Sequence, residues 1–308
     1  MDNNIPQEYQ VFLTMDSAEL TEVLDLMIEC MLQLSMSNRN KMVSLRVNDA
    51  NLFFQMLMSK VIYLRRNIPE ISVSFPPYTI DFQDPAVIAQ LCRQTYEAIC
   101  TFWGVFIVPD TEDKRTILHL TYAVTGLRKR QGFELEALGE SSQKAKAEDA
   151  KMIADGMDAI RATEYYGHLD DKNRKMLEKH ITAWDFRCFT LSDDYQVSDK
   201  IRYEDVPVLR HVKKNILTNM YPYLCAHAHS SYYSLNQFAA WYEPQGEGME
   251  KAYKDIVDMF LKFIIMLLSV AIKDVVEYFD EMKKGYMQLP SETRRIIDGY
   301  CEIATERE

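Results

Sequence analysis

Glycine and proline are scarce in this chain, and their scarcity constrains the fold more than any other feature of the sequence. The 308 residues include 10 glycines and 10 prolines, roughly half of the usual combined share of these two chain breakers. Sandwiches, propellers, barrels and doubly wound α/β folds need a turn every ~8 to 15 residues, usually built on Gly, Pro, Asn or Asp. The shortage therefore predicts an all-α fold made of long helices.

Hydrophobic periodicity divides the chain into about nine predicted helices. Their expected ranges are 17–35, 40–67, 85–107, 112–131, 142–165, 171–183, 205–242 with a kink or restart at Tyr221-Pro222, 249–284, and 290 to the charged end. The apolar fraction of 47% and the charged fraction of 26% are those of an ordinary globular chain. We therefore expect one helical bundle, a single domain over residues 1–308.

Three segments interrupt the helical pattern. Residues 70–82 alternate apolar residues with serines up to Pro76-Pro77, which predicts a short extended segment. Residues 185–205 hold five aspartates and lack a helical period, which predicts a long irregular loop. That loop is the candidate for a sub-boundary or a functional loop, and residues 243–248 are a predicted linker before the long C-terminal helix.

Charge and cysteine usage exclude several classes of function. The net charge of −11 disfavours general nucleic-acid binding, and the one dense basic run, Arg128-Lys129-Arg130, is interpreted as a solvated helix end. The six cysteines form no C-x-x-C pair, which is typical of reduced thiols in a cytoplasmic protein. The strongest apolar stretch, residues 260–272, is too short to cross a bilayer, and the N-terminus has no signal-peptide pattern, so no membrane association is expected.

The predicted helix 85–107 carries two polar residues on an unusual face. At about 100° per residue, Arg93 and Glu97 share a face with small residues, namely Ala86, Ala89, Cys100 and Gly104. Small residues allow another element to approach closely, so this polar pair is expected to be at least half buried. The pair is either an ion pair that supports the helix or part of a pocket.

The predicted helix 222–242 shows a similar mixture of residues. His229 shares a face with Tyr233 and Asn236, and these three side chains together could bind a ligand or relay a proton. The alternative for His229 is a hydrogen-bonded histidine of the core. His227 and His229 lie about 200° apart on a regular helix, so they cannot bind one metal ion, and no metal site is predicted.

Searches for known chemical motifs give no firm result. The sequence contains no dinucleotide-binding, P-loop, nucleophile-elbow or zinc-protease motif, so no cofactor is predicted. Arg174 and His180 fit the loose R-x(4–6)-H pattern of HEPN ribonucleases, but chance supplies about one such match in a chain of this composition.

Two motifs resemble those of a bacterial family of all-helical proteins of unknown function. The family's R-x-x-x-E helix matches at Arg93 and Glu97, and its Y-x-x-L-S-x-x-x-H helix matches at Tyr221, Leu224 and His229, with Cys225 where serine is usual. The resemblance covers roughly residues 45 to 240, and its extension to HEPN-like bundles is an analogy at the level of fold.

The resemblance implies that the two polar faces meet in one site. There Arg93 would bind an anion, Glu97 would orient the anion or act as a base, and His229 would donate a hydrogen bond or act as a general acid or base. The candidate catalytic residues are Glu97 and His229. The candidate ligand-binding residues are Arg93, Glu97, Tyr221, His229, Tyr233 and Asn236.

The sequence thus predicts an intracellular binding or interaction module for a small anionic ligand or a protein partner, with a homodimer as one option. The alternative is a HEPN-like, metal-independent ribonuclease of a defence or toxin system. Whether the chain is an enzyme is left open.

Overall fold

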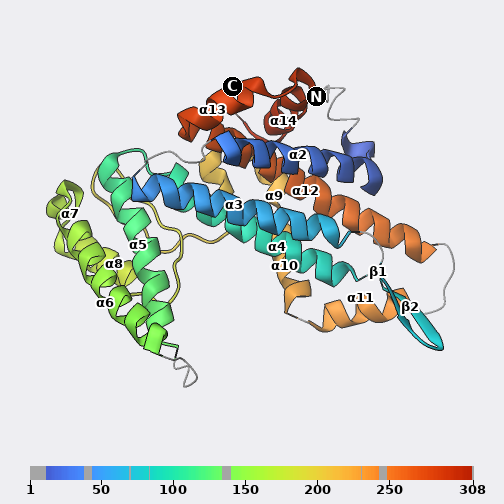
Figure 1. Cartoon of the computed structure of the whole chain (residues 1–308), viewed down its shortest axis with the longest axis horizontal. Coiled ribbons are helices and arrows are strands. Elements are labelled where there is room, and N and C mark those ends of the chain that lie inside the picture. The colour runs from blue at the N-terminus through green and yellow to red at the C-terminus, as the bar shows by residue number, and fades with distance from the viewer. Residues whose placement is uncertain are drawn as a thin grey trace. The chain divides into compact units, whose positions relative to one another are not determined.

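The computed structural model describes residues 12–37, 44–68, 71–82, 84–133, 140–229, 231–242 and 248–306. Within these ranges the chain forms 13 α-helices, two short turns of π- and 3₁₀-helix, and one two-stranded hairpin (Figure 1). The predicted all-α fold is confirmed. The predicted number of about nine helices is wrong, because several predicted helices are split.

Contacts along the chain group its residues into two compact units. The larger unit combines Met1–Ile99 with Arg210–Glu308, and the smaller unit is Cys100–Leu209. Whether the two units fold as the single domain predicted above stays a prediction. The predicted linker at 243–248 falls, up to residue 247, outside the described ranges.

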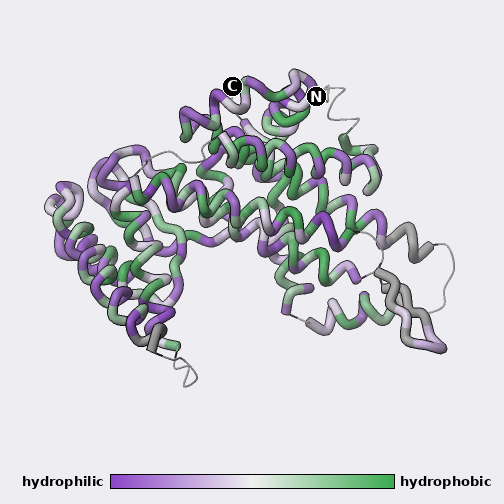
Figure 2. Tube along the Cα trace, viewed as in Figure 1, coloured by the Kyte–Doolittle hydropathy of each residue, from purple (hydrophilic) through white to green (hydrophobic). Residues whose placement is uncertain are grey.

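The larger unit is built around one long buried helix, α12 (Gly248–Tyr278). It packs against α2, α11, α13 and α14, and nearly every side chain from Val257 to Val276 is buried, as its almost wholly apolar sequence predicts. Hydrophobic and hydrophilic stretches alternate along the surrounding helices (Figure 2). The other elements of this unit are α2 (Ser17–Ser37), α3 (Leu45–Arg66), β1 (Ile71–Phe75), β2 (Tyr78–Phe82), α9 (Lys214–Leu217), α10 (Met220–Ala228), α11 (Tyr232–Tyr242), α13 (Asp280–Gln288), α14 (Ser291–Ala304) and α4 (Pro85–Phe102) up to Ile99.

Local signals in the sequence set several helix starts as predicted. The carboxylate of Asp16 accepts from the amides of Ala18 and Glu19 at 3.0 Å, and Glu19 Oε2 accepts from the Asp16 amide at 3.1 Å, so a capping box opens α2. Asp84 Oδ1 accepts from the Ala86 amide at 2.8 Å and α4 begins at Pro85.

The extended segment predicted at 70–82 is a hairpin. Strands β1 and β2 pair antiparallel, with Ile71 opposite Phe82 and Phe75 opposite Tyr78. The alternation of apolar residues and serines in this region therefore reflects a strand period.

The predicted helix 205–242 was expected to have one kink or restart at Tyr221-Pro222, and the chain instead breaks it at three places, one of them just before Met220, close to the expected restart. Near the start of the predicted helix, the chain forms only a short 3₁₀ turn, at Pro207–Arg210. Asn219 adopts a left-handed backbone (φ 61°) before α10, a conformation that asparagine tolerates. Ser231 Oγ then accepts from the Ser234 amide at 3.2 Å and caps a separate helix α11.

Two further predicted helices are each divided in two. The predicted helix 142–165 ends at Arg161, and Thr163 Oγ1 accepts from the Tyr166 amide at 3.2 Å to open the short helix α7 (Glu164–His168). The predicted helix 249–284 ends at Tyr278, and α13 starts at Asp280.

The smaller unit packs around α5 (Glu112–Gln131), which matches its predicted range. Helix α5 contacts α6 (Glu140–Arg161), α7, α8 (Asp171–Ile181) and the π-helical turn η1 (Trp103–Ile107). A buried apolar cluster joins these helices to the segment that follows α8. Residues 185–205 form no helix and no named strand, apart from one bridge between Leu191 and Val197.

No helix in the described part of the chain is long and apolar enough to cross a membrane. All six cysteines lie within the described ranges, and none of them forms a disulfide bond.

Gly104 was expected to mark close packing between helices, but its close neighbour is a residue of the irregular segment. Gly104 lies in η1, and a Cβ placed on it would come within 2.5 Å of Cys188 Sγ. The close approach therefore fastens the segment that contains Cys188 to η1 within the smaller unit.

We expect Gly104→Ala to lower the free energy of unfolding by about 1–3 kcal/mol, because Cys188 has to move. The control is Gly126→Ala on α5, where no atom lies within 4 Å of the added Cβ; it should raise stability by about 0.5–1 kcal/mol. Urea unfolding followed by circular dichroism measures both changes. Equal effects of the two substitutions would contradict the packing described here.

Candidate functional site

Helix α4 presents Arg93 and Glu97 one turn apart on the same face. Arg93 Nε donates to Glu97 Oε1 at 2.8 Å, and the side chains are 20% and 29% exposed. The expectation that both are at least half buried is thus confirmed. This bond holds the guanidinium group along the helix axis, and part of the Arg93 side chain stays exposed to solvent.

Helix α10 brings Tyr221 onto the same pair. Its hydroxyl donates to Glu97 Oε1 at 2.7 Å, and the Arg93 guanidinium carbon lies 5.7 Å from the centre of the Tyr221 ring. On its other side Tyr221 contacts the buried ring of Tyr96, with 5.3 Å between the ring centres. Glu97 therefore accepts two hydrogen bonds, one from its own helix and one from α10.

His229 completes the group at the C-terminal end of α10. Its Nε2 atom lies 3.0 Å from Arg93 Nη1, and the residue is exposed. A guanidinium group can only donate hydrogen bonds, so His229 Nε2 must accept this one. With Nε2 as the acceptor, the ring proton of this tautomer is on Nδ1.

The electrostatics of these residues reflect the shared carboxylate. Burial lowers the pKa of Arg93, but the hydrogen bond and the charge of Glu97 outweigh it and raise that pKa above its usual value. Burial, followed by the bond to Glu97, raises the pKa of the Tyr221 hydroxyl. Arg93 and Tyr221 thus stay protonated at neutral pH, as donors to Glu97.

Cys225 lies beside this cluster, where the resembling family carries serine. The thiol is half buried and interacts electrostatically with both Arg93 and Tyr221. The comparison with the family's motif identified Cys225 as a cysteine in place of the usual serine. It did not indicate that the thiol would lie next to the guanidinium group of Arg93.

Tyr233 and Asn236 lie apart from the hydrogen bonds of this cluster. They were placed with His229 by assuming one regular helix, and the break at Ser231 changes their direction. Tyr233 contacts the rings of Tyr223 and His227, with 6.0 and 5.7 Å between centres, and its hydroxyl accepts from Gln237. Asn236 is exposed on α11.

The core histidine of this region is His227, whereas His229 is exposed. His227 is 1% exposed, and neither of its ring nitrogens has a hydrogen-bond partner in the described part of the chain. Burial lowers the pKa of His227, so its imidazole stays neutral. His227 is thus a histidine of the core, but the described part of the chain does not give it the hydrogen bonds that the alternative for His229 assumed.

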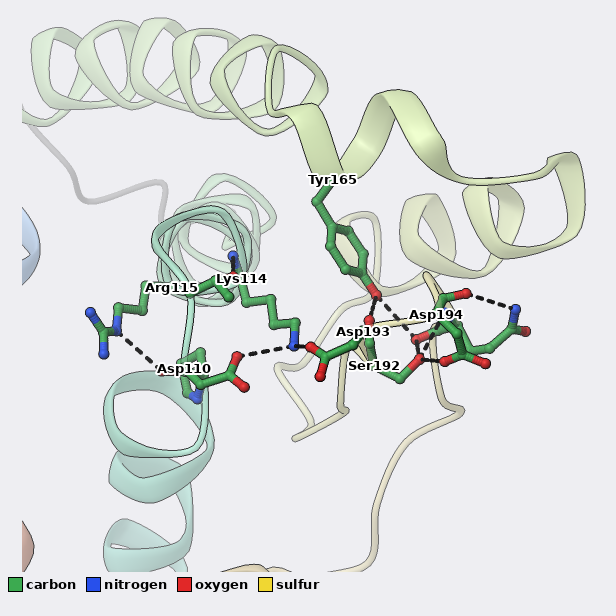
Figure 3. Close-up of polar contacts among 10 residues, drawn as sticks. Asp110, Lys114, Arg115, Tyr165, Ser192, Asp193 and Asp194 are labelled. Carbon is green, nitrogen blue, oxygen red and sulfur yellow. Dashed lines mark hydrogen bonds and ion pairs between the residues drawn. The ribbon is translucent and has the colours of Figure 1, made fainter.

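A second polar cluster lies in the smaller unit and was not predicted (Figure 3). The ammonium group of Lys114 donates to Asp110 at 3.0 Å and to Asp193 at 2.5 Å, while its side chain is 6% exposed. Tyr165 donates from its hydroxyl to the Ser192 carbonyl at 2.9 Å, and burial raises its pKa to about 12. These bonds hold the 192–196 turn against α5 and α7.

The irregular segment 185–205 is thus fastened at several points. Besides Lys114 and Tyr165, Asn173 Oδ1 of α8 accepts from the Val197 amide at 2.8 Å. The carboxylates of Asp110 and Asp193 both accept hydrogen bonds from the Lys114 ammonium group. The bond from Lys114 lowers the pKa of Asp110. These contacts give the segment a structural role within the smaller unit.

Arg174 and His180, the loose HEPN pattern, are also engaged in packing. His180 is 7% exposed, stacks on Phe189 with 4.1 Å between ring centres, and has Nε2 at 2.9 Å from the Ser198 carbonyl. Arg174 Nη2 donates to the Leu169 carbonyl at 3.0 Å. In the described ranges, no three His, Cys, Asp or Glu side chains are grouped as a metal site.

We expect Arg93→Ala to lower the free energy of unfolding by about 1–3 kcal/mol, since it leaves Glu97 without its guanidinium partner. The matched control is Gln94→Ala, which truncates the neighbouring exposed residue of α4 and should change stability by less than about 0.5 kcal/mol. Chemical unfolding of both variants measures the difference. An Arg93→Ala protein as stable as the control would show that the pair contributes nothing to the fold.

Comparison of the chain with models of protein families, with curated proteins and with solved structures gives no match. The resemblance of the Arg93 and Tyr221 motifs to a bacterial helical family therefore stays a prediction.

Proposed function

We propose that this chain is a binding module for a small anionic ligand, which docks at Arg93 and His229. The observation that carries the proposal is the 3.0 Å contact between Arg93 Nη1 and His229 Nε2 at a solvent-facing edge. The two residues come from different helices, 136 positions apart in the chain. A carboxylate or phosphate group is the ligand that such an edge of N–H donors recognises.

Both side chains can offer donors to the same anion. A guanidinium group has five N–H donors, and the bonds described above engage Nε and Nη1. His229 accepts at Nε2, so its Nδ1–H group is the donor that remains. An anion with two acceptor oxygens would accept from Arg93 Nη2 through one of them and from His229 Nδ1 through the other.

Glu97 has a positioning role in this proposal. Its Oε1 atom accepts from both Arg93 and Tyr221, so the carboxylate is committed to the orientation of the guanidinium group. Its negative charge also opposes an incoming anion, which favours modest affinity. A role of Glu97 as a base, the other option raised by the sequence, would fall to Oε2, because Oε1 accepts both of these bonds.

The binding test uses isothermal titration calorimetry of the full chain with inorganic phosphate and with malonate as separate probes. We expect at least one probe to bind, and Arg93→Gln to weaken that binding by about ten- to a hundredfold, the usual worth of a charged hydrogen bond. His229→Ala should weaken it as well. Arg65→Gln, which removes a cation paired with Asp25 elsewhere in the same unit, is the matched control and should leave binding unchanged.

Absence of binding by both probes, or equal binding by wild type and Arg93→Gln, would contradict the proposal. The ribonuclease alternative is tested in parallel by incubating the purified protein with total RNA. RNA cleavage by the wild-type protein that is lost in His229→Ala and in Glu97→Ala would show that the chain is a ribonuclease and would reject the proposal of a binding module. Absence of cleavage over a range of salt concentrations would reject the ribonuclease.

A further inference from the structure

A cavity of about 310 Å³ opens in the larger unit beside the core helix α12. Its volume is at the lower end of the range for small-molecule sites. Helices α9 and α10 form one wall through Ile216 and Met220, and α12 forms the opposite wall with residues from Asp255 to Met266. None of the six candidate ligand-binding residues lines this cavity, so it is a separate site.

The apolar part of the lining is rich in methionine. Met220, Met259 and Met266 line the cavity together with Phe263. Unbranched thioether side chains adapt their shape to flexible aliphatic groups. This part of the cavity is therefore suited to an alkyl chain and offers it no hydrogen-bonding group.

The polar part of the lining carries two carboxylates and one ammonium group. Asp255 and Asp258 lie one turn apart on α12, and Lys262 follows one turn later. The ammonium group of Lys262 donates to the Leu13 carbonyl at 2.8 Å, which directs that cation toward the main chain. The lining therefore keeps a net negative charge of one.

Asp258 has a carboxylate oxygen that lacks a hydrogen-bond donor among the described residues. Its Oδ1 atom is buried and accepts no hydrogen bond within the described part of the chain, and such an atom is costly to leave unsatisfied. Burial raises the pKa of Asp258, with Asp16 and Asp255 adding to the effect and Lys254 and Lys262 opposing it. The rest of the Asp258 side chain is partly exposed, so a ligand in the cavity that donates to this carboxylate would offset the cost.

We propose that this cavity binds an aliphatic primary ammonium compound, with the ammonium group on Asp258 and the alkyl chain along Met220, Met259 and Met266. The charge of the lining selects a cation, the buried oxygen selects a hydrogen-bond donor, and the methionine wall selects an unbranched chain. An anionic ligand would meet two carboxylates here, so this site and the Arg93 site have opposite charge preferences.

Isothermal titration calorimetry of the full chain with n-hexylammonium chloride, 1-hexanol and sodium hexanoate tests the proposal. The three probes share one alkyl chain and differ in the head group. We expect hexylammonium to bind at least about tenfold more tightly than hexanol, because only the cation forms a charged hydrogen bond with Asp258. Hexanoate should not bind in this cavity, and any binding of its carboxylate at the Arg93 site is recognised by its loss in Arg93→Gln.

Two substitutions on α12 separate the site from general charge effects. Asp258→Asn removes the carboxylate charge and should weaken hexylammonium binding about tenfold. Glu277→Gln removes one carboxylate from an exposed position of the same helix, outside the cavity, and should leave binding unchanged. Melting curves of both variants verify that they are folded.

Equal affinity for hexanol and hexylammonium, or no binding of hexylammonium by the wild-type chain, would overturn the proposal. So would unchanged binding by folded Asp258→Asn. The comparison of probes on the wild-type chain decides the question even if Asp258→Asn does not fold.

Discussion

The guanidinium group of Arg93 can donate hydrogen bonds but cannot accept them. The arrangement of the polar site in the larger unit depends on this property. Each group in contact with it has to accept: Glu97 does so through its carboxylate, and His229 through Nε2. Tyr221 then donates to the same carboxylate oxygen, which joins α10 to α4. One fixed cation thus determines the orientation of a carboxylate, a phenol and an imidazole that come from distant parts of the sequence.

The apolar core supplies the frame in which such a group can be held. Helix α12 is buried for most of its length and is surrounded by α2, α11, α13 and α14. Within this core Arg210 donates two hydrogen bonds to Asp274, whose side chain is fully buried. A buried carboxylate is tolerated only with such a partner. Asp258 on the same helix has a buried oxygen that lacks such a partner in the described chain, and this contrast supports the proposal of a binding site in the cavity beside α12.

The sequence predicts those parts of the fold that local signals determine. The capping box at Asp16, the proline after Asp84 and the apolar period of α5 each place a helix end correctly. The same reasoning fails where a helix is interrupted without Gly or Pro. The break at Ser231 depends on a serine cap that also fits a continuous helix, so Tyr233 and Asn236 were assigned to the wrong face.

Within the site, helical spacing pairs Arg93 with Glu97, but tertiary structure decides the rest. Wheel geometry separates His227 from His229 and cannot say which of them is buried, because burial depends on what packs against α10. In the smaller unit, Lys114 contacts Asp110 one helical turn away and Asp193 79 positions along the chain. No local sequence pattern reveals the second of these contacts. The family resemblance joins Tyr221 and His229 to Arg93, and only coordinates show which atoms donate and which accept.

The protonation of His229 tests this account most directly. A long-range ¹H–¹⁵N correlation spectrum of the chain labelled with ¹⁵N-histidine distinguishes the two neutral tautomers and the imidazolium ion, and His229→Ala identifies the signal among the six histidines. The account predicts a lone pair on Nε2 of His229 and the proton on Nδ1, and it predicts that Arg93→Gln alters this signal. A proton on Nε2 would contradict the contact with Arg93, since two donors would then face each other.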